Sequence, residues 1–171
     1  LTYPGFKLLA ESLRLELLPI RASGNGPDLK ALEALCTRRK VRALYAMPTM
    51  HNPLGWVMSL TRRNKLIAIA RKHGVTIIED AAYAFLADDP PPPLATLAPD
   101  ITVYVSALSK SIATGLRVGF IAAPERFIPQ LERSIRATTW NTAAVMTTLG
   151  CRWLEDGTID QLEAVKRADA A

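Results

Sequence analysis

The chain has 171 residues, of which 49% are hydrophobic and 22% charged, a composition typical of a globular domain that excludes a disordered one. Its net charge of +5 comes from short basic clusters spread along the sequence, whereas a nucleic-acid groove would gather them on one face. No apolar run approaches the roughly 20 residues of a membrane span, and the two cysteines form no zinc or redox motif. Since no signal peptide opens the sequence, we expect a cytoplasmic protein without a metal site.

The first half of the chain alternates between helical and extended patterns. In chain order the patterns predict a helix over 6–13, a strand over 15–20, a turn at 23–26, a helix after 28, a strand over 41–47, a loop over 48–55, a helix from 59 or 61 to 73, and a strand over 75–78. Asp28 is a candidate N-cap and Gly74 a helix stop. We expect Leu66 to point inward from the helix before Gly74, and Arg63 to point outward.

The second half continues the alternation after a stiff connection. The patterns predict an extended polyproline loop over 88–93, strands over 101–106 and 118–122, and helices over 124–136 and 143–155. The four prolines could bind a partner domain, but a stiff surface connection is the favoured interpretation. Strands that alternate with helices predict an α/β fold with three layers: a mostly parallel sheet with helices on both faces.

Both ends of the sequence look cut, because no strand precedes the opening turn and no cap closes the last helical pattern. We therefore expect the chain to be a fragment of a longer protein.

Unusual polar residues follow three of the predicted strands. Asn52 lies in the loop after the first, Asp80 and Tyr83 follow the second, and Lys110 follows the third, with Arg117 seven residues later. Ligands of such sheets bind at the carboxyl ends of the strands, so we expect these five side chains to converge. Each residue taken alone is better explained as a surface, capping or turn residue, and only the combination indicates a site.

Pyridoxal 5′-phosphate (PLP) requires this set of residue types. A lysine amine, here Lys110, forms the Schiff base, and a carboxylate, here Asp80, keeps the pyridine nitrogen protonated. An amide and a phenol, Asn52 and Tyr83, suit the phenolic oxygen of the cofactor. A guanidinium, Arg117, matches the phosphate dianion.

The motifs that carry these residues resemble those of the fold-type-I PLP-dependent enzymes, with aspartate aminotransferase as the prototype. The likeness consists of H-N-P-x-G at 51–55, D-x-x-Y at 80–83, S-K at 109–110 and G-x-R-x-G at 115–119. The resemblance implies that Ser109 contacts the phosphate and that the ring of Tyr3 stacks on the pyridine. Position 107 is Ala where the family commonly has Ser or Thr, so Ser106 or Ser109 would have to compensate.

The resemblance also implies a homodimer, an amino acid or amine as the ligand, and two regions outside the chain. These regions are the phosphate cradle before Leu1 and the small domain after Ala171. By the same resemblance, residues 1–156 would be an incomplete large domain, and residues 157–171 would begin the helix that leads to the small domain. Within the family, the sequence around Trp140 and Trp153 is similar to that of MocR-type regulators of the GntR group. In those regulators a winged helix-turn-helix domain binds DNA.

Three functions therefore remain open: the effector-sensing domain of such a transcription regulator, a free-standing aminotransferase, or, as a more distant alternative, a PLP-dependent lyase or decarboxylase. All three would use Lys110, Asp80 and Tyr83 as the chemical core. For the two tryptophans, helix packing is favoured over a ligand role.

Overall fold

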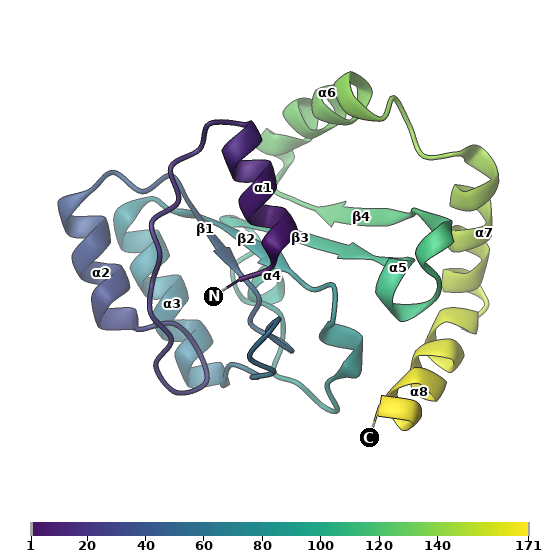
Figure 1. Ribbon diagram of the computed structural model, residues 1–171, viewed down its shortest axis with the longest axis horizontal. Helices are drawn as coiled ribbons and strands as arrows, with labels where there is room; N and C mark the ends of the chain where they lie inside the picture. Colours follow the sequence, from purple (N-terminus) through teal and green to yellow (C-terminus); the bar gives the residue numbers. More distant parts are fainter. Residues whose placement is uncertain (1, 171) are drawn as a thin grey trace.

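The computed structural model describes residues 2–170, and a four-stranded sheet forms its centre (Figure 1). The strands, in their order across the sheet, are β1 (Ala43–Ala46), β2 (Thr76–Asp80), β3 (Thr102–Ala107) and β4 (Gly119–Ala122). The first three strands are parallel, and β4 returns antiparallel to β3. The predicted mostly parallel sheet is therefore confirmed.

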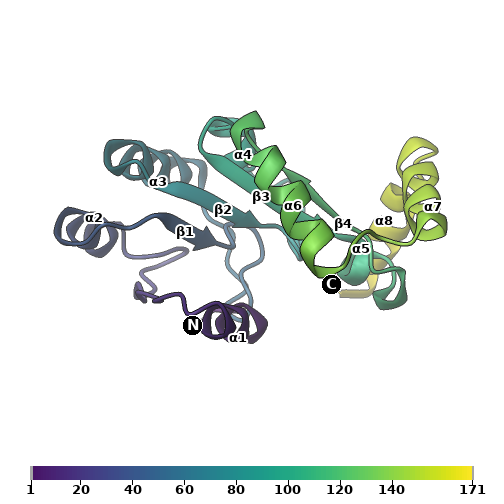
Figure 2. The same cartoon turned by 90° about the horizontal axis from the view of Figure 1, so that it is seen from above.

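Helices cover both faces of this sheet. The helices are α1 (Pro4–Ser12), α2 (Leu29–Arg38), α3 (Leu60–His73), α4 (Leu94–Leu97), α5 (Leu108–Ser111), α6 (Ile128–Thr138), α7 (Ala144–Glu155) and α8 (Thr158–Ala170), with 3-10 turns η1 (Ala84–Leu86), η2 (Thr114–Leu116) and η3 (Glu125–Phe127). In Figure 2, α1 lies on one side of the sheet and α3 on the other. None of the helices within residues 2–170 combines the length and the apolar character that crossing a membrane requires.

The main core lies between the sheet and α3. Leu66, Ile67 and Ala70, which recur on one side of α3, are buried against Ile77 of β2 and Leu94 of α4. A helix with buried residues at this spacing is held mainly by packing on the sheet. The inward direction predicted for Leu66 is confirmed.

The predicted ends of α2 and α3 are also confirmed. Asp28 Oδ1 accepts hydrogen bonds from the backbone N–H groups of Lys30 and Ala31, both at 3.0 Å, so it caps α2. Ser59 Oγ accepts from the backbone N–H of Arg62 at 3.4 Å and starts α3. Gly74 ends α3 with φ +64°, the left-handed conformation that glycine adopts without a steric penalty.

Two expectations for the first half of the chain are wrong. No strand forms over residues 15–20, because no neighbouring strand offers hydrogen bonds; the nearby pairing is a single bridge between Ala22 and Pro27. Arg63 does not point outward but is fully buried. Charged residues are almost never buried without partners, and the spacing along the helix gives no sign of the carbonyl groups that receive this guanidinium.

A second, smaller core joins α5, β4, α7 and α8. It contains Leu108, Val118 and Ile159, with Trp153 packed against them. The helix-packing prediction is confirmed for Trp153 and wrong for Trp140, which is 74% exposed.

Candidate cofactor site

Three parallel strands end at one edge of the sheet, and the predicted site residues follow them. Asp80 is the last residue of β2, Asn52 lies in the loop after β1, and Lys110 lies in α5, directly after β3. The backbone N–H of Ala81 donates to the carbonyl of Val105 at 2.9 Å, which continues the β2–β3 pairing past Asp80. The sheet therefore brings these three segments to the same edge.

The antiparallel return of β4 brings Arg117 to that edge as well. The backbone N–H of Leu108 donates to the carbonyl of Val118 at 3.0 Å, so the turn with Lys110 and the residue after Arg117 are tied together. Arg117 has φ +55° and ψ +27°, a left-handed conformation that is uncommon for a residue other than glycine. Such conformations cluster at functional sites, where the surrounding structure enforces them.

Asp80 is held by hydrogen bonds to both of its carboxylate oxygens. Oδ1 accepts from the backbone N–H of Ala82 at 2.9 Å, and Oδ2 accepts from the hydroxyl of Tyr45. Tyr45 lies on β1, and the parallel register places it opposite Ile78, on the face of the sheet that also carries Asp80. The sequence did not identify Tyr45, because a tyrosine in a strand is ordinarily a packing residue.

Asn52 lies in a loop that closes on itself. The backbone N–H of Met58 donates to the carbonyl of Pro48 at 2.7 Å, and that of His51 donates to the carbonyl of Trp56 at 3.1 Å. The His51 ring is buried at 4.3 Å from the ring of Trp56, and this burial lowers the pKa of the imidazole. The loop thus presents Asn52 from an ordered backbone.

The guanidinium of Arg63 supports this loop from inside the fold. Nη2 donates to the carbonyl of Pro48 at 3.2 Å and to Thr49 Oγ1 at 2.7 Å, while Nε donates to the carbonyl of Met58 at 2.9 Å. Nη1 donates to the carbonyl of Pro92 at 3.2 Å and lies 3.9 Å from Glu79 Oε1. A buried charge thus connects the Asn52 loop, the proline stretch and the residue before Asp80.

The polar groups of four predicted site residues have no hydrogen-bond or ion-pair partner among the described residues. Within residues 2–170 the side chains of Asn52, Tyr83, Lys110 and Arg117 make no hydrogen bond or ion pair. Asn52 and Tyr83 are half-buried, and the other two are exposed. An amine, a guanidinium, an amide and a phenol beside a fixed carboxylate fit the aldehyde, phosphate, phenolic oxygen and ring nitrogen of PLP.

Two serines of the expected site are placed differently. Ser106 follows Tyr104 by two residues on β3, and the register places both on the face that carries Glu79, opposite Asp80. Ser106 lines a hollow there, together with Ser111 and Glu163. Ser109 lies next to Lys110 and is half-buried, so it stays at the sheet edge.

Tyr3, the residue expected to stack on the pyridine of the cofactor, directly precedes α1. Its exposed ring lies against Gly5, where an added Cβ atom would meet it at 2.6 Å. The ring of Phe6 stacks on Tyr45, with 3.9 Å between centroids and 11° between planes.

Helix α8 holds the segments that carry Lys110 and Tyr83. Lys166 Nζ donates to the carbonyls of Lys110 at 3.1 Å and Ile112 at 3.0 Å. Arg167 Nη1 donates to the carbonyl of Phe85 at 2.9 Å. Sequence patterns could not identify these contacts, because exposed basic residues on a helix ordinarily face solvent.

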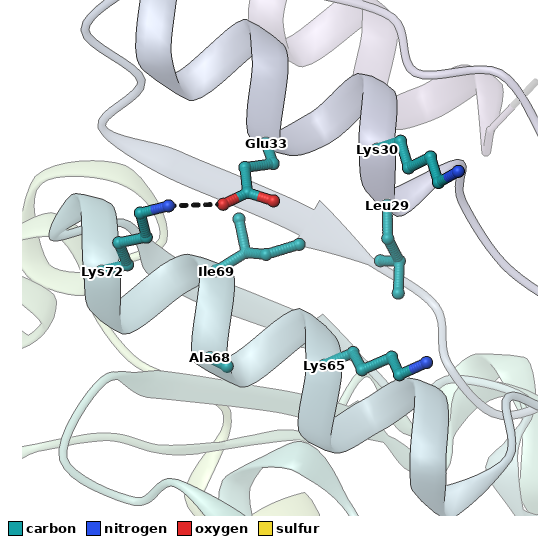
Figure 3. Close-up of a pocket in the computed structure, with 7 residues that line it drawn as sticks. All are labelled: Leu29, Lys30, Glu33, Lys65, Ala68, Ile69 and Lys72. Atoms are coloured by element: carbon teal, nitrogen blue, oxygen red, sulfur yellow. Dashed lines mark hydrogen bonds and ion pairs between the residues drawn. The ribbon is translucent and has the colours of Figure 1, made fainter.

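A second hollow lies between α2 and α3, away from these residues (Figure 3). Lys72 Nζ lies 2.6 Å from Glu33 Oε1 across it, while Lys30 and Lys65 line its other end. None of the predicted site residues lines this hollow.

The chain is similar in sequence to one protein family and to individual proteins of known sequence. Residues 1–169 match the aminotransferase class I and II family. The chain is 31% identical over 151 residues to YdeF of Bacillus subtilis, an uncharacterized HTH-type transcriptional regulator, covering 88% of the chain and 33% of that protein. It is 29% identical over 173 residues to the 2-aminoadipate transaminase of Thermus thermophilus, covering 96% of the chain and 44% of that enzyme.

The fold of the chain is also similar to that of solved aminotransferase structures. LysN, an α-aminoadipate aminotransferase of Thermus thermophilus crystallised with N-(5′-phosphopyridoxyl)-L-leucine, superposes with a TM-score of 0.90 at 27% identity. The match covers 99% of the chain and 46% of LysN, so the chain spans between a third and a half of the length of these three relatives. Fold and relatives define an aminotransferase-like α/β domain. The chain belongs to the aminotransferase class I and II family, whose cofactor is pyridoxal 5′-phosphate.

Proposed function

We propose that Lys110 binds PLP covalently and that the residues around it hold the rest of the cofactor. Asp80 would face the pyridine nitrogen, and Asn52 and Tyr83 the phenolic oxygen. Arg117 and Ser109 would bind the phosphate. The observation that carries this proposal is the meeting of three parallel strand ends and one antiparallel return at a single edge of the sheet.

Each residue then has a defined chemical task. PLP, when bound, supplies an electron sink for charge that develops at the Cα atom of an amino acid. The Lys110 amine would form the covalent bond to the cofactor, and the same amine would serve as the general base for the Cα proton of a bound amino acid. Asp80 would hold a proton on the ring nitrogen, and Arg117 would keep the phosphate end fixed.

We further propose that the chain is the effector-sensing domain of a GntR/MocR-type transcription regulator that acts as a homodimer. The domain over 1–156 would bind PLP and an amino acid or amine, and residues 157–171 would lead to a smaller domain. DNA would be bound only by a separate winged helix-turn-helix domain. The likeness to YdeF over 88% of the chain supports this role, and so does Ala107, because a sensor tolerates a weaker phosphate site than an enzyme that turns over.

A free-standing aminotransferase is the second candidate. The likeness to the 2-aminoadipate transaminase over 96% of the chain and to LysN favours it. The residues proposed to bind PLP do not separate the two roles, because both begin with the same attachment of an amino compound to the cofactor. The parts of the protein beyond these residues would decide between DNA binding and turnover.

DNA binding by the full-length protein tests the regulator role. We expect it to bind the DNA upstream of its own gene on the order of 1,000-fold more tightly than scrambled DNA, with an affinity that falls steeply with salt. Addition of PLP, with or without candidate amino acids, should change this affinity. Gel-shift or fluorescence-anisotropy titrations at several salt concentrations measure both effects. Efficient turnover of a common amino donor without any DNA binding would favour the enzyme instead.

A further inference from the structure

The contact between Tyr45 and Asp80 joins two neighbouring strands at the candidate site. Tyr45 lies one residue before the end of β1, and Asp80 ends β2. The Tyr45 hydroxyl donates to Oδ2 of Asp80, while the backbone N–H of Ala82 occupies Oδ1. The carboxylate is therefore fixed by one side-chain donor and one backbone donor.

Tyr45 is itself held in place from the N-terminal side. The Phe6 ring of α1 stacks on it at a centroid distance of 3.9 Å, and both rings are half-buried. Burial, followed by the hydrogen bond to Asp80, raises the pKa of the Tyr45 phenol well above its ordinary value. The hydroxyl therefore remains protonated and acts as a donor at every physiological pH.

We infer that Tyr45 is a positioning residue that holds the Asp80 carboxylate in the orientation that accepts a hydrogen bond from the protonated ring nitrogen of PLP, an inference that rests on the proposed cofactor site. A proton between a pyridine nitrogen and a carboxylate can stay on either partner. A hydrogen bond that is donated to the ionised carboxylate favours that form. The proton then stays on the ring nitrogen, where the electron sink requires it.

The Tyr45→Phe variant isolates this hydroxyl, because the ring that stacks on Phe6 is retained. The experiment uses the full-length protein reconstituted with PLP that carries ¹⁵N in the ring, and measures the ¹⁵N chemical shift together with the cofactor dissociation constant. We expect the ring ¹⁵N signal of Tyr45→Phe to move toward the value of unprotonated pyridine. The dissociation constant should rise roughly tenfold, as expected when a hydrogen bond to a charged group is lost.

Tyr104→Phe is the matched control. Tyr104 is also a half-buried strand tyrosine, but the register places it on the opposite face of the sheet, beside Glu79. Removal of the Tyr104 hydroxyl should leave the ¹⁵N chemical shift of the PLP ring nitrogen unchanged. Thermal unfolding of both variants separates an effect on the cofactor from a general loss of stability.

Asp80→Asn supplies the reference for complete loss of the carboxylate. If Asp80→Asn moves the ring ¹⁵N signal and Tyr45→Phe does not, the role of Tyr45 is refuted while the cofactor site stands. If neither variant moves the signal, the assignment of Asp80 to the ring nitrogen fails, and the inference fails with it. A ¹⁵N shift of equal size in Tyr104→Phe would also overturn the inference.

Discussion

Asp80→Asn is expected to leave the cofactor attached to Lys110 and to slow removal of the Cα proton of a bound amino acid by about 100-fold or more. An amide cannot hold a proton on the pyridine nitrogen, so charge that develops at Cα is no longer drawn into the ring. The loss of one charge-assisted hydrogen bond, about 3 kcal/mol, corresponds to a factor of this size.

Exchange of the Cα proton with solvent deuterium measures this step in a sensor as well as in an enzyme. Absorbance of the bound cofactor checks that attachment at Lys110 is retained. Asp88→Asn is a suitable control, because Asp88 is an exposed carboxylate in the loop beyond η1. Exchange in Asp80→Asn at the parental rate would remove Asp80 from the proposed role.

Arg63→Leu is expected to lower the free energy of unfolding by about 3–5 kcal/mol, because it leaves the buried carboxylate of Glu79 without its cation. The carbonyls of Pro48, Met58 and Pro92 lose their donor in the same step. Urea unfolding of the parental protein and of Arg63→Leu measures the difference in the free energy of unfolding. Arg71→Ala is the control: it breaks an exposed ion pair with Asp100, which should contribute 1 kcal/mol or less.

This destabilisation should depend on pH in one direction. Burial raises the pKa of the Glu79 carboxyl above its ordinary value, and removal of Arg63 raises it further. A group whose folded-state pKa is raised binds its proton more tightly in the folded protein, so stability falls as the pH rises through that pKa. The loss caused by Arg63→Leu should therefore be larger at pH 8 than at pH 5. An equal loss at both pH values would show that the ion pair contributes little.

The sequence predicted the layers of the fold and the sheet edge at which the candidate site lies. Continuous apolar runs marked the parallel strands, and local signals such as Asp28 and Gly74 marked the helix ends. The edge of the sheet then followed from topology, because parallel strands end on the same side. The segments that carry Asn52, Asp80 and Lys110 could therefore be assigned to one edge of the sheet from the sequence alone.

Contacts between distant segments could not be predicted in the same way. The helical pattern predicts that Arg63 faces solvent. Its partners are backbone carbonyls in other segments, and because every residue has a backbone carbonyl, a sequence pattern does not mark the ones that bind Arg63. Tyr45 reaches Asp80 only through the register of β1 against β2. Ser106 is a candidate for the phosphate because position 107 is Ala, but alternation along β3 directs its side chain to the face opposite Asp80.

Reduction of the PLP-loaded full-length protein with borohydride, followed by peptide mass mapping, tests the central assignment most directly. Reduction fixes the cofactor to the lysine that carries it. We expect one pyridoxyl group per chain, on Lys110, and none in Lys110→Ala, which should keep its fold because this side chain is exposed. Lys166→Ala, which alters a neighbouring lysine of α8, should still be labelled on Lys110. Pyridoxyl mass on a different lysine, or on none, would refute the assignment of the cofactor to Lys110.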